Sequence, residues 1–226
     1  QQSSTLRPES EERDSNNRWL SRMPLRRLEA EPLRDSLLVT SGQLDTTAFG
    51  VPDAVVGRAD GLVTAIRKDS GWRRTVYVQQ RRSTLPSILE TFDLPQMNPN
   101  CVERPNSMVA SQALHLLNNG MIRDLTRQFA QRIEAKAGDD RYKQVNEVYQ
   151  DALSRKPTPE ETQLALEVLS KLTAEWESRT TSESEAGTKS DTGKKSDTTE
   201  SPSAETLALA NFCHVIMNSA EFLFVD

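Results

Sequence analysis

The stretch PTPEETQLALEVLSKLTAEW, residues 157–176, decides the fold because it combines a complete helix start with a clear helical repeat. Thr158 can cap the helix, Pro159 suits a first turn whose amides need no partner, and Glu161 can complete a capping box. The apolar side chains that follow fall on one helical face, at Ala165, Val168, Leu169, Leu172 and Trp176. The stretch therefore predicts a long amphipathic helix.

Three further segments of the second half carry the same helical repeat. Their apolar faces are Met121, Ile122, Leu125, Phe129 and Ile133; Val145, Val148, Tyr149 and Ala152; and Leu209, Phe212, Cys213 and Ile216. We expect these helices to pack as hairpins around short turns, the first at residues 118–120. Residues 19–23 and 33–44 also look helical, with Pro32 near the start of the second helix rather than inside it.

Other parts of the chain predict a strand, a loop and a frayed end. The β-branched run Thr75–Val78 predicts one short strand, with residues 62–66 as its candidate partner. Residues 177–205 contain no Val, Ile, Leu, Met or aromatic residue, which predicts a disordered loop inserted between two helices. The polar residues 1–17 are expected to be frayed.

The fold class that follows is mainly α: helical hairpins with one short β element and an inserted disordered loop. We expect a single domain over residues 18–226. A hydrophobic content of 35% suits a chain of which part is not packed. The net charge of −5 argues against nucleic-acid binding, which needs a clustered cationic surface. No apolar run reaches the roughly 18–20 residues that span a bilayer.

Charged residues around the predicted strand are the one candidate site: Arg73, Arg74, Arg81 and Arg82 flank the strand, and Glu90 and Asp93 follow it. The candidate cluster within this group is Arg81, Arg82 and Asp93. One interpretation is a site for an anion or an acidic glycan, because guanidinium groups bind carboxylate and sulfate in a bidentate fashion. The other is that Arg81 or Arg82 pairs with Asp93 and fastens a loop to the helices. We favour the structural pair, since a charge cluster alone does not identify a site.

The sequence predicts no catalytic residue, metal ligand or cofactor site in this segment. His115 and His214 are the only histidines, and neither has the spacing of a metal site. Cys101 and Cys213 lie too far apart in sequence for a Cys-x-x-Cys-His haem attachment. They could form a disulfide, but we expect two buried thiols instead. A Gly-x-Ser-x-Gly nucleophile motif does not occur.

Short motifs occur in a fixed order along most of residues 18–176 and 206–226. They are Arg26–Glu31, Arg34–Leu38, Gly42, Val76–Val78, Arg81–Arg82, Thr91–Pro95, Gln112–Leu114, Leu116–Asn118, Ala152–Arg155, Pro157–Glu161, Asn218–Ser219 and Glu221–Leu223. In this order they resemble the domain-of-unknown-function family fifteen fifty-three, the C-terminal domain of large planctomycete-type exported proteins. The family has no established activity.

The resemblance implies a location and a set of partners. Family members resemble exported proteins, periplasmic or at the cell surface, whose N-terminal parts carry a signal peptide, a haem-binding segment and a companion domain. The chain starts at Gln1 without a methionine, which suggests a fragment or a processed form. We therefore expect a non-catalytic structural or interaction domain that contacts other domains of the same parent protein.

Two alternatives remain open. One is part of an extracellular polysaccharide-processing enzyme that binds acidic polysaccharide through the Arg-rich segment, and the other is a docking partner for a haem domain. A deep cleft containing Arg81, Arg82 and Asp93 would favour the enzyme, whereas a flat apolar patch would favour docking.

Overall fold

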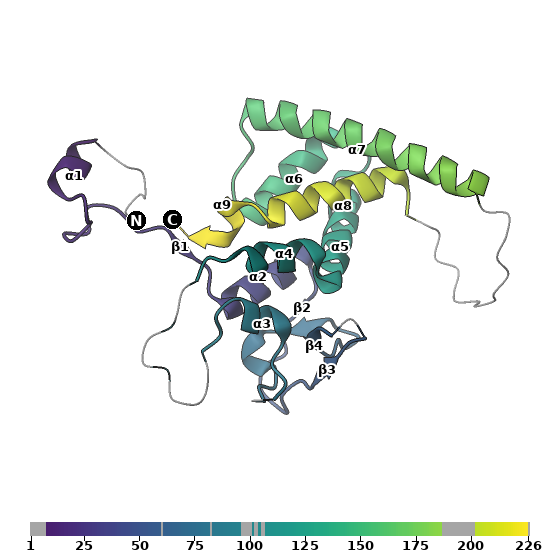
Figure 1. Ribbon diagram of the computed structural model, residues 1–226. Coiled ribbons are helices and arrows are strands. Elements are labelled where there is room, and N and C mark those ends of the chain that lie inside the picture. Colours follow the sequence, from purple (N-terminus) through teal and green to yellow (C-terminus); the bar gives the residue numbers. More distant parts are fainter. Residues whose placement is uncertain are drawn as a thin grey trace.

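The protein is mainly α-helical, with a small region of short strands beside the helices (Figure 1). The computed structural model describes residues 8–59, 61–81, 83–95, 101, 104, 107–186 and 202–225. One apolar core joins residues from α2 to α9, and Leu33, Leu89, Phe129, Val148, Leu169 and Cys213 are among its completely buried members.

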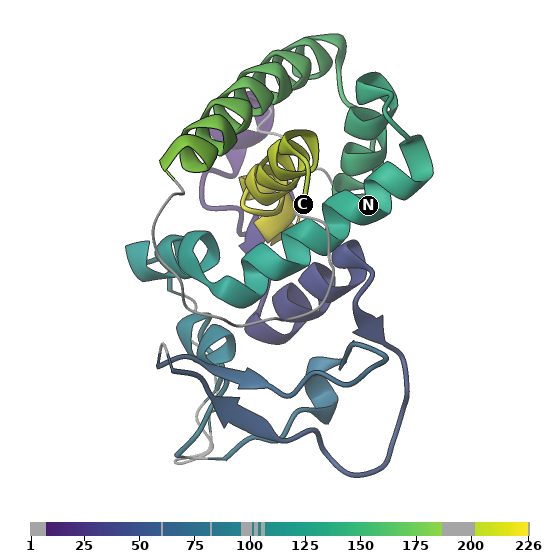
Figure 2. The same cartoon turned by 90° about the vertical axis from the view of Figure 1, so that its right-hand side faces the viewer.

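Four helices of the second half form the main bundle: α5 (Gly120–Ala137), α6 (Arg141–Leu153), α7 (Pro159–Ala186) and α8 (Ala204–Met217). Figure 2 shows α8 lying between α5, α6 and α7. The predicted apolar faces of α5 and α8 are buried in full, and that of α6 is buried except for the half-buried Ala152. The helical repeat of these segments is thereby confirmed.

The predicted capping box at the start of α7 is present. The backbone amide of Thr158 donates to Glu161 Oε2 at 2.7 Å, and the backbone amide of Glu161 donates to Thr158 Oγ1 at 3.2 Å. Each residue thus satisfies an amide that the first helical turn leaves without a partner. The predicted turn before α5 is also confirmed, because Asn119 caps that helix by accepting from the amide of Met121.

The boundaries expected for the inserted loop were too wide. Residues 177–186 continue α7, and residues 204 and 205 already belong to α8. The polar side chains of residues 177–179 are exposed, and a solvated helix tolerates them, so low apolar content did not end the helix there. The central part of the expected loop, residues 187–201, lies outside the described residues.

The first half contributes α1 (Pro8–Arg13), α2 (Ala30–Ser41), α3 (Ser87–Thr91) and α4 (Ala110–Asn118), and α9 (Ala220–Leu223) lies near the end of the chain. Within the segment expected to be frayed, residues 8–13 form α1, and residues 1–7 lie outside the described part. Pro32 lies in the first turn of α2, as predicted, and Gly42 ends that helix with φ of 73°.

The helix predicted at residues 19–23 is wrong. The carboxylate of Asp14 accepts hydrogen bonds from the backbone amides of Arg18 and Trp19 at 2.7 and 3.0 Å. These bonds hold the segment in turns, because a local side-chain acceptor competes with helix formation.

Six short strands form three two-stranded sheets in the described part of the chain. Antiparallel pairs join β1 (Arg26–Arg27) to β6 (Phe224–Val225) and β3 (Val55–Gly57) to β4 (Val63–Ala65), and a parallel pair joins β2 (Leu44–Asp45) to β5 (Trp72–Arg73). The strand predicted at residues 75–78 is wrong, because residues 75–77 form a 3₁₀ turn, η1 (Thr75–Tyr77). Its candidate partner does contain a strand, β4, which pairs with β3 instead.

The two cysteines differ in their exposure to solvent. Cys101 is exposed and Cys213 is buried, and no disulfide joins them, so the expectation of two buried thiols was half right. Among the described residues, no helix has the length and apolar character needed to cross a membrane.

Candidate functional site: the Asp93 clamp and the α4 face

Asp93 lies immediately after α3 in a conformation that fixes where its carboxylate points. Its φ is +64°, and the amide of Leu94 donates to the carbonyl of Leu89 at 2.9 Å. This is the helix ending in which a left-handed residue reverses the chain, and Asp is one of the few non-glycine residues that tolerate that conformation. Leu89 and Leu94 are both buried, so the core holds the turn in place.

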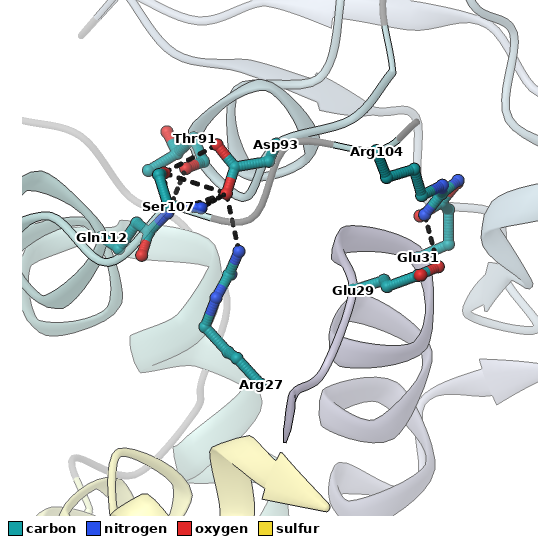
Figure 3. Close-up of polar contacts among 8 residues, drawn as sticks. All are labelled: Arg27, Glu29, Glu31, Thr91, Asp93, Arg104, Ser107 and Gln112. Carbon is teal, nitrogen blue, oxygen red and sulfur yellow. Dashed lines mark hydrogen bonds and ion pairs between the residues drawn. The ribbon is translucent and has the colours of Figure 1, made fainter. Parts of the chain in front are cut away.

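The carboxylate of Asp93 joins three segments that are distant in sequence (Figure 3). It accepts from Arg27 Nη2 at 2.7 Å, from the Ser107 amide at 2.8 Å, from the Ser107 hydroxyl at 2.7 Å and from Gln112 Nε2 at 3.4 Å. Gln112 also donates to the carbonyl of Thr91 at 3.1 Å. We call Arg27, Asp93, Ser107 and Gln112 the Asp93 clamp. It ties β1 and the start of α4 to the end of α3.

The electrostatics of the clamp keep Asp93 ionised. Burial acts to raise the pKa of Asp93, but the amide and hydroxyl of Ser107, the charge of Arg27 and the amide of Gln112 together bring this pKa below its ordinary value. Its two oxygens already accept several hydrogen bonds. The carboxylate is therefore poorly suited to act as a general base.

Arg27 is a costly residue to bury. Its side chain is 6% exposed and stacks over the Phe92 ring at 5.0 Å, while Nε and Nη1 are buried without a hydrogen-bond partner among the described residues. Asp93 is thus its one counter-charge in the described part of the chain, which makes the pair sensitive to the loss of either partner.

A second ion-pair group lies close to the clamp in Figure 3. Arg104 donates to Glu31 at 2.6 and 3.0 Å and also binds Glu29, so it fastens its own segment to the start of α2. The hydrogen bond from Arg104 lowers the pKa of Glu31. All three side chains are partly exposed, so this group contributes little to stability.

The structure separates most of the arginines that the sequence grouped with Asp93. Arg73 is buried and pairs with Asp53 at 2.9 Å, whereas Arg74 is exposed and reaches Asp35 on α2 at 3.3 Å. Arg81 is exposed in a short turn bridged to Thr84. Arg82 lies outside the described residues.

Among the described residues, the ion-pair partner of Asp93 is Arg27 and not Arg81. Sequence reasoning missed Arg27 because the two residues are 66 positions apart and no local pattern links them. The anion-site interpretation of Arg81, Arg82 and Asp93 stays a prediction.

Arg73 holds a projecting loop instead of lining a site. Its guanidinium donates to the carbonyls of Phe49 and Val51 at 2.7 and 2.6 Å, and its bonds to Asp53 fix the base of the loop. Phe49 has a φ of +65° and a side chain that is 83% exposed. The loop is therefore rigidly fastened although its tip is apolar and solvated.

A groove of about 950 Å³ runs beside α2 and the end of α6. Its charged lining residues are bound to neighbours: Asp35 accepts from the amide and hydroxyl of Thr75, and Glu221 pairs with Arg155. The groove thus offers a surface but no convergent reactive groups. In the described part of the chain, no three His, Cys, Asp or Glu side chains lie together as a metal site would require.

Helix α4 has one side that is buried and an opposite side that is apolar but exposed. Its inner side buries Leu116 and Gln112, the latter within the Asp93 clamp. Its outer side has residues at the i, i+3, i+4 and i+7 positions of one face, with two apolar residues just before the helix. We call this surface the α4 face: Met108, Val109, Ala110, Ala113, Leu114 and Leu117, all of them exposed. An apolar stripe at helical spacing is normally covered by another element.

The fold and the site define a mainly helical domain in which the prominent charged side chains fasten the chain and an apolar helix face is left open. The family described as "Protein of unknown function (DUF1553)", PSD1, matches residues 1–169. The chain belongs to this family, which confirms the resemblance at the level of the family. Neither a curated protein nor a solved structure matches the chain.

Proposed function

We propose that this chain is a non-catalytic interaction domain of an exported multidomain protein, and that the α4 face docks on the companion domain of the same parent. The observation that carries the proposal is the exposure of Leu114 and Leu117, at 56% and 48%, on a helix whose other side is buried. Contiguous exposed apolar surface of this kind marks interaction sites in soluble proteins.

The Asp93 clamp supports the proposal because it positions the α4 face. Ser107 and Gln112 lie just before and within α4, and both bind Asp93. His115, on the inner side, contacts Asn119 at 2.8 Å and Thr91 at 3.4 Å. A helix held this firmly presents a pre-organised surface, which lowers the entropic cost of binding.

The enzyme alternative receives less support from the same geometry. A polysaccharide-processing enzyme would bind its substrate through the Arg-rich segment, and Arg73 and Arg74 of that segment already pair with Asp53 and Asp35. A haem-binding segment is a second possible occupant of the α4 face, because a flat apolar patch suits docking. We prefer the companion domain because the family resemblance implies that it belongs to the same parent chain.

The proposal is tested by changing the α4 face in the parent protein. Leu114→Asp together with Leu117→Asp should release the domain and raise the radius of gyration in solution X-ray scattering, because each carboxylate would have to be desolvated on docking. Leu164→Asp is the matched control, since Leu164 is 62% exposed but lies on α7. An unchanged radius of gyration in the double variant would refute docking through α4. If the α4 face protects a haem-binding segment from amide hydrogen exchange, and not the companion domain, then that segment is the occupant.

A further inference from the structure

A second surface continues the α4 face onto the main bundle. A groove of about 460 Å³ lies between the end of α4 and the helices α5, α7 and α8, and Leu117 belongs both to this groove and to the α4 face. Its apolar lining includes Trp176 from α7 and Leu207 and Ala210 from α8. Leu117 therefore links the α4 face to the apolar residues of the groove, which polar side chains border.

The charged residues that line this groove, among those the structure describes, are both basic. They are Arg123 and Arg127, one turn apart on α5, and no described Asp or Glu lines the groove. This is notable in a chain whose net charge is −5. Arg127 pairs with Asp124 at 3.0 Å, but both side chains are more than half exposed, so a weak surface pair of this kind can give way to a partner's carboxylate.

We infer that the element that docks here is an acidic amphipathic helix, with its apolar side chains on Leu114, Leu117 and the groove and its carboxylates beside Arg123 and Arg127. The inference rests on the proposed function and states the chemistry of the docked element. In helix-in-groove recognition, apolar anchors at helical spacing supply the affinity, and flanking charges select the partner.

The lining favours a helix over a sugar chain. The α4 face and the groove together present an apolar strip along helices, which complements residues at the i, i+3, i+4 and i+7 positions of a partner helix. A saccharide would use the polar and cationic residues of the groove but would leave Leu114 uncovered. Binding of an acidic oligosaccharide is therefore a distinct outcome of the test.

The test uses two labelled synthetic helical peptides with the same Leu positions, one flanked by Glu and the other by Lys, and measures binding to the 226-residue chain by fluorescence anisotropy. The Glu peptide should bind about fivefold more tightly at low salt, which is the size of effect that two solvent-exposed ion pairs give. This preference should shrink as salt is added, because exposed charges are screened.

Arg123→Glu with Arg127→Glu should abolish or reverse the preference. Lys143→Glu with Lys171→Glu is the matched control, because it makes the same change in net charge at basic residues in exposed surface pairs outside the groove. The control variant should keep the preference for the Glu peptide.

Equal binding of both peptides, or a preference that survives the arginine substitutions, would overturn the inference. Binding of an oligogalacturonate that the arginine substitutions abolish, with no binding of the Glu peptide, would overturn it in favour of a saccharide. These failures are distinct from failure of the proposed function. If Leu114→Asp with Leu117→Asp releases the domain in the parent but the arginine substitutions do not, docking stands and only the acidic partner is wrong.

Discussion

Asp93 shows how one residue can fix several segments at once. Its left-handed backbone ends α3, and its carboxylate meets a strand on one side and the start of α4 on the other. Asn could keep the backbone conformation, but it could not supply the negative charge that Arg27 needs. The substitution therefore separates the role of the charge from the role of the backbone.

Asp93→Asn should lower the free energy of unfolding by about 3 kcal/mol, because it leaves the buried guanidinium of Arg27 without its counter-charge. Urea unfolding followed by circular dichroism measures the change. Arg81→Ala is the control, and it should change stability by less than about 0.5 kcal/mol because Arg81 is exposed. A variant as stable as the wild type, with altered binding of sulfated glycans, would instead support the anion-site interpretation.

Phe49 is a strained residue with little burial to offset the strain. Phe49→Gly should stabilise the protein by up to about 1 kcal/mol, because glycine adopts positive φ without the steric cost that a side chain imposes. Val51→Gly is the matched control: Val51 is equally exposed but has no positive φ, so the added flexibility should destabilise by about 0.5–1 kcal/mol. Equal destabilisation of both variants in thermal unfolding would mean that Phe49 is not strained.

At the level of single residues, the sequence predicted local partners better than distant ones. Thr158 and Glu161 are three positions apart, so their contact follows from helix geometry alone. The contact between Arg27 and Asp93 depends on how β1 is placed by its pairing with β6, and no local pattern encodes that pairing.

At the level of elements, the capping box offers the cleanest stability test. Thr158→Ala should destabilise the protein by about 1 kcal/mol, because the amide of Glu161 loses its acceptor at the start of α7. The midpoint of urea unfolding measures this loss. Thr173→Ala is a useful comparison, because Thr173 bonds the carbonyl of Leu169 within the same helix and caps nothing. An unchanged midpoint for Thr158→Ala would show that the box contributes nothing to the helix start.

The same box gives a pH dependence. The hydrogen bonds from Arg155, and then the amide of Thr158, lower the pKa of Glu161 to about 2 from an ordinary value of 4.5. A carboxylate whose pKa is lowered by folding contributes stability above its ordinary pKa, and the contribution is lost as pH falls towards the folded value. Between pH 5 and pH 2, Glu161→Gln should therefore lose less unfolding free energy than the wild type, as measured by urea unfolding at each pH. Identical slopes would contradict the assigned network.

The sequence misassigned the elements whose conformation depends on tertiary contacts. The run at residues 75–78 has β-branched side chains, yet the amide and hydroxyl of Thr75 both bind the carboxylate of Asp35 on α2 and hold a 3₁₀ turn there. Strand propensity mainly reflects side-chain packing on a sheet, so the contacts with Asp35 outweigh it here. The β3–β4 hairpin gave only a weak signal because each strand has three residues.

At the scale of the whole molecule, the bundle could be predicted because its helices bury one apolar face each. For α4, the sequence cannot tell the inner side from the outer side, since Leu116 faces the core while Leu114 and Leu117 do not. Only the fold reveals that a stripe with the spacing of a core face is exposed. If the α4 face is a docking surface, that stripe must be covered in the parent protein.

The most direct measurement is amide hydrogen exchange of residues 108–118 in the 226-residue chain and in the parent protein under the same conditions. Docking should slow exchange along α4 in the parent and leave α6, which contributes no residue to the α4 face or to the groove beside it, with the same rates in both. Leu114→Asp with Leu117→Asp should return the α4 rates of the parent to those of the isolated chain. Equal exchange along α4 in the two wild-type proteins would contradict the claim that the α4 face is a docking surface.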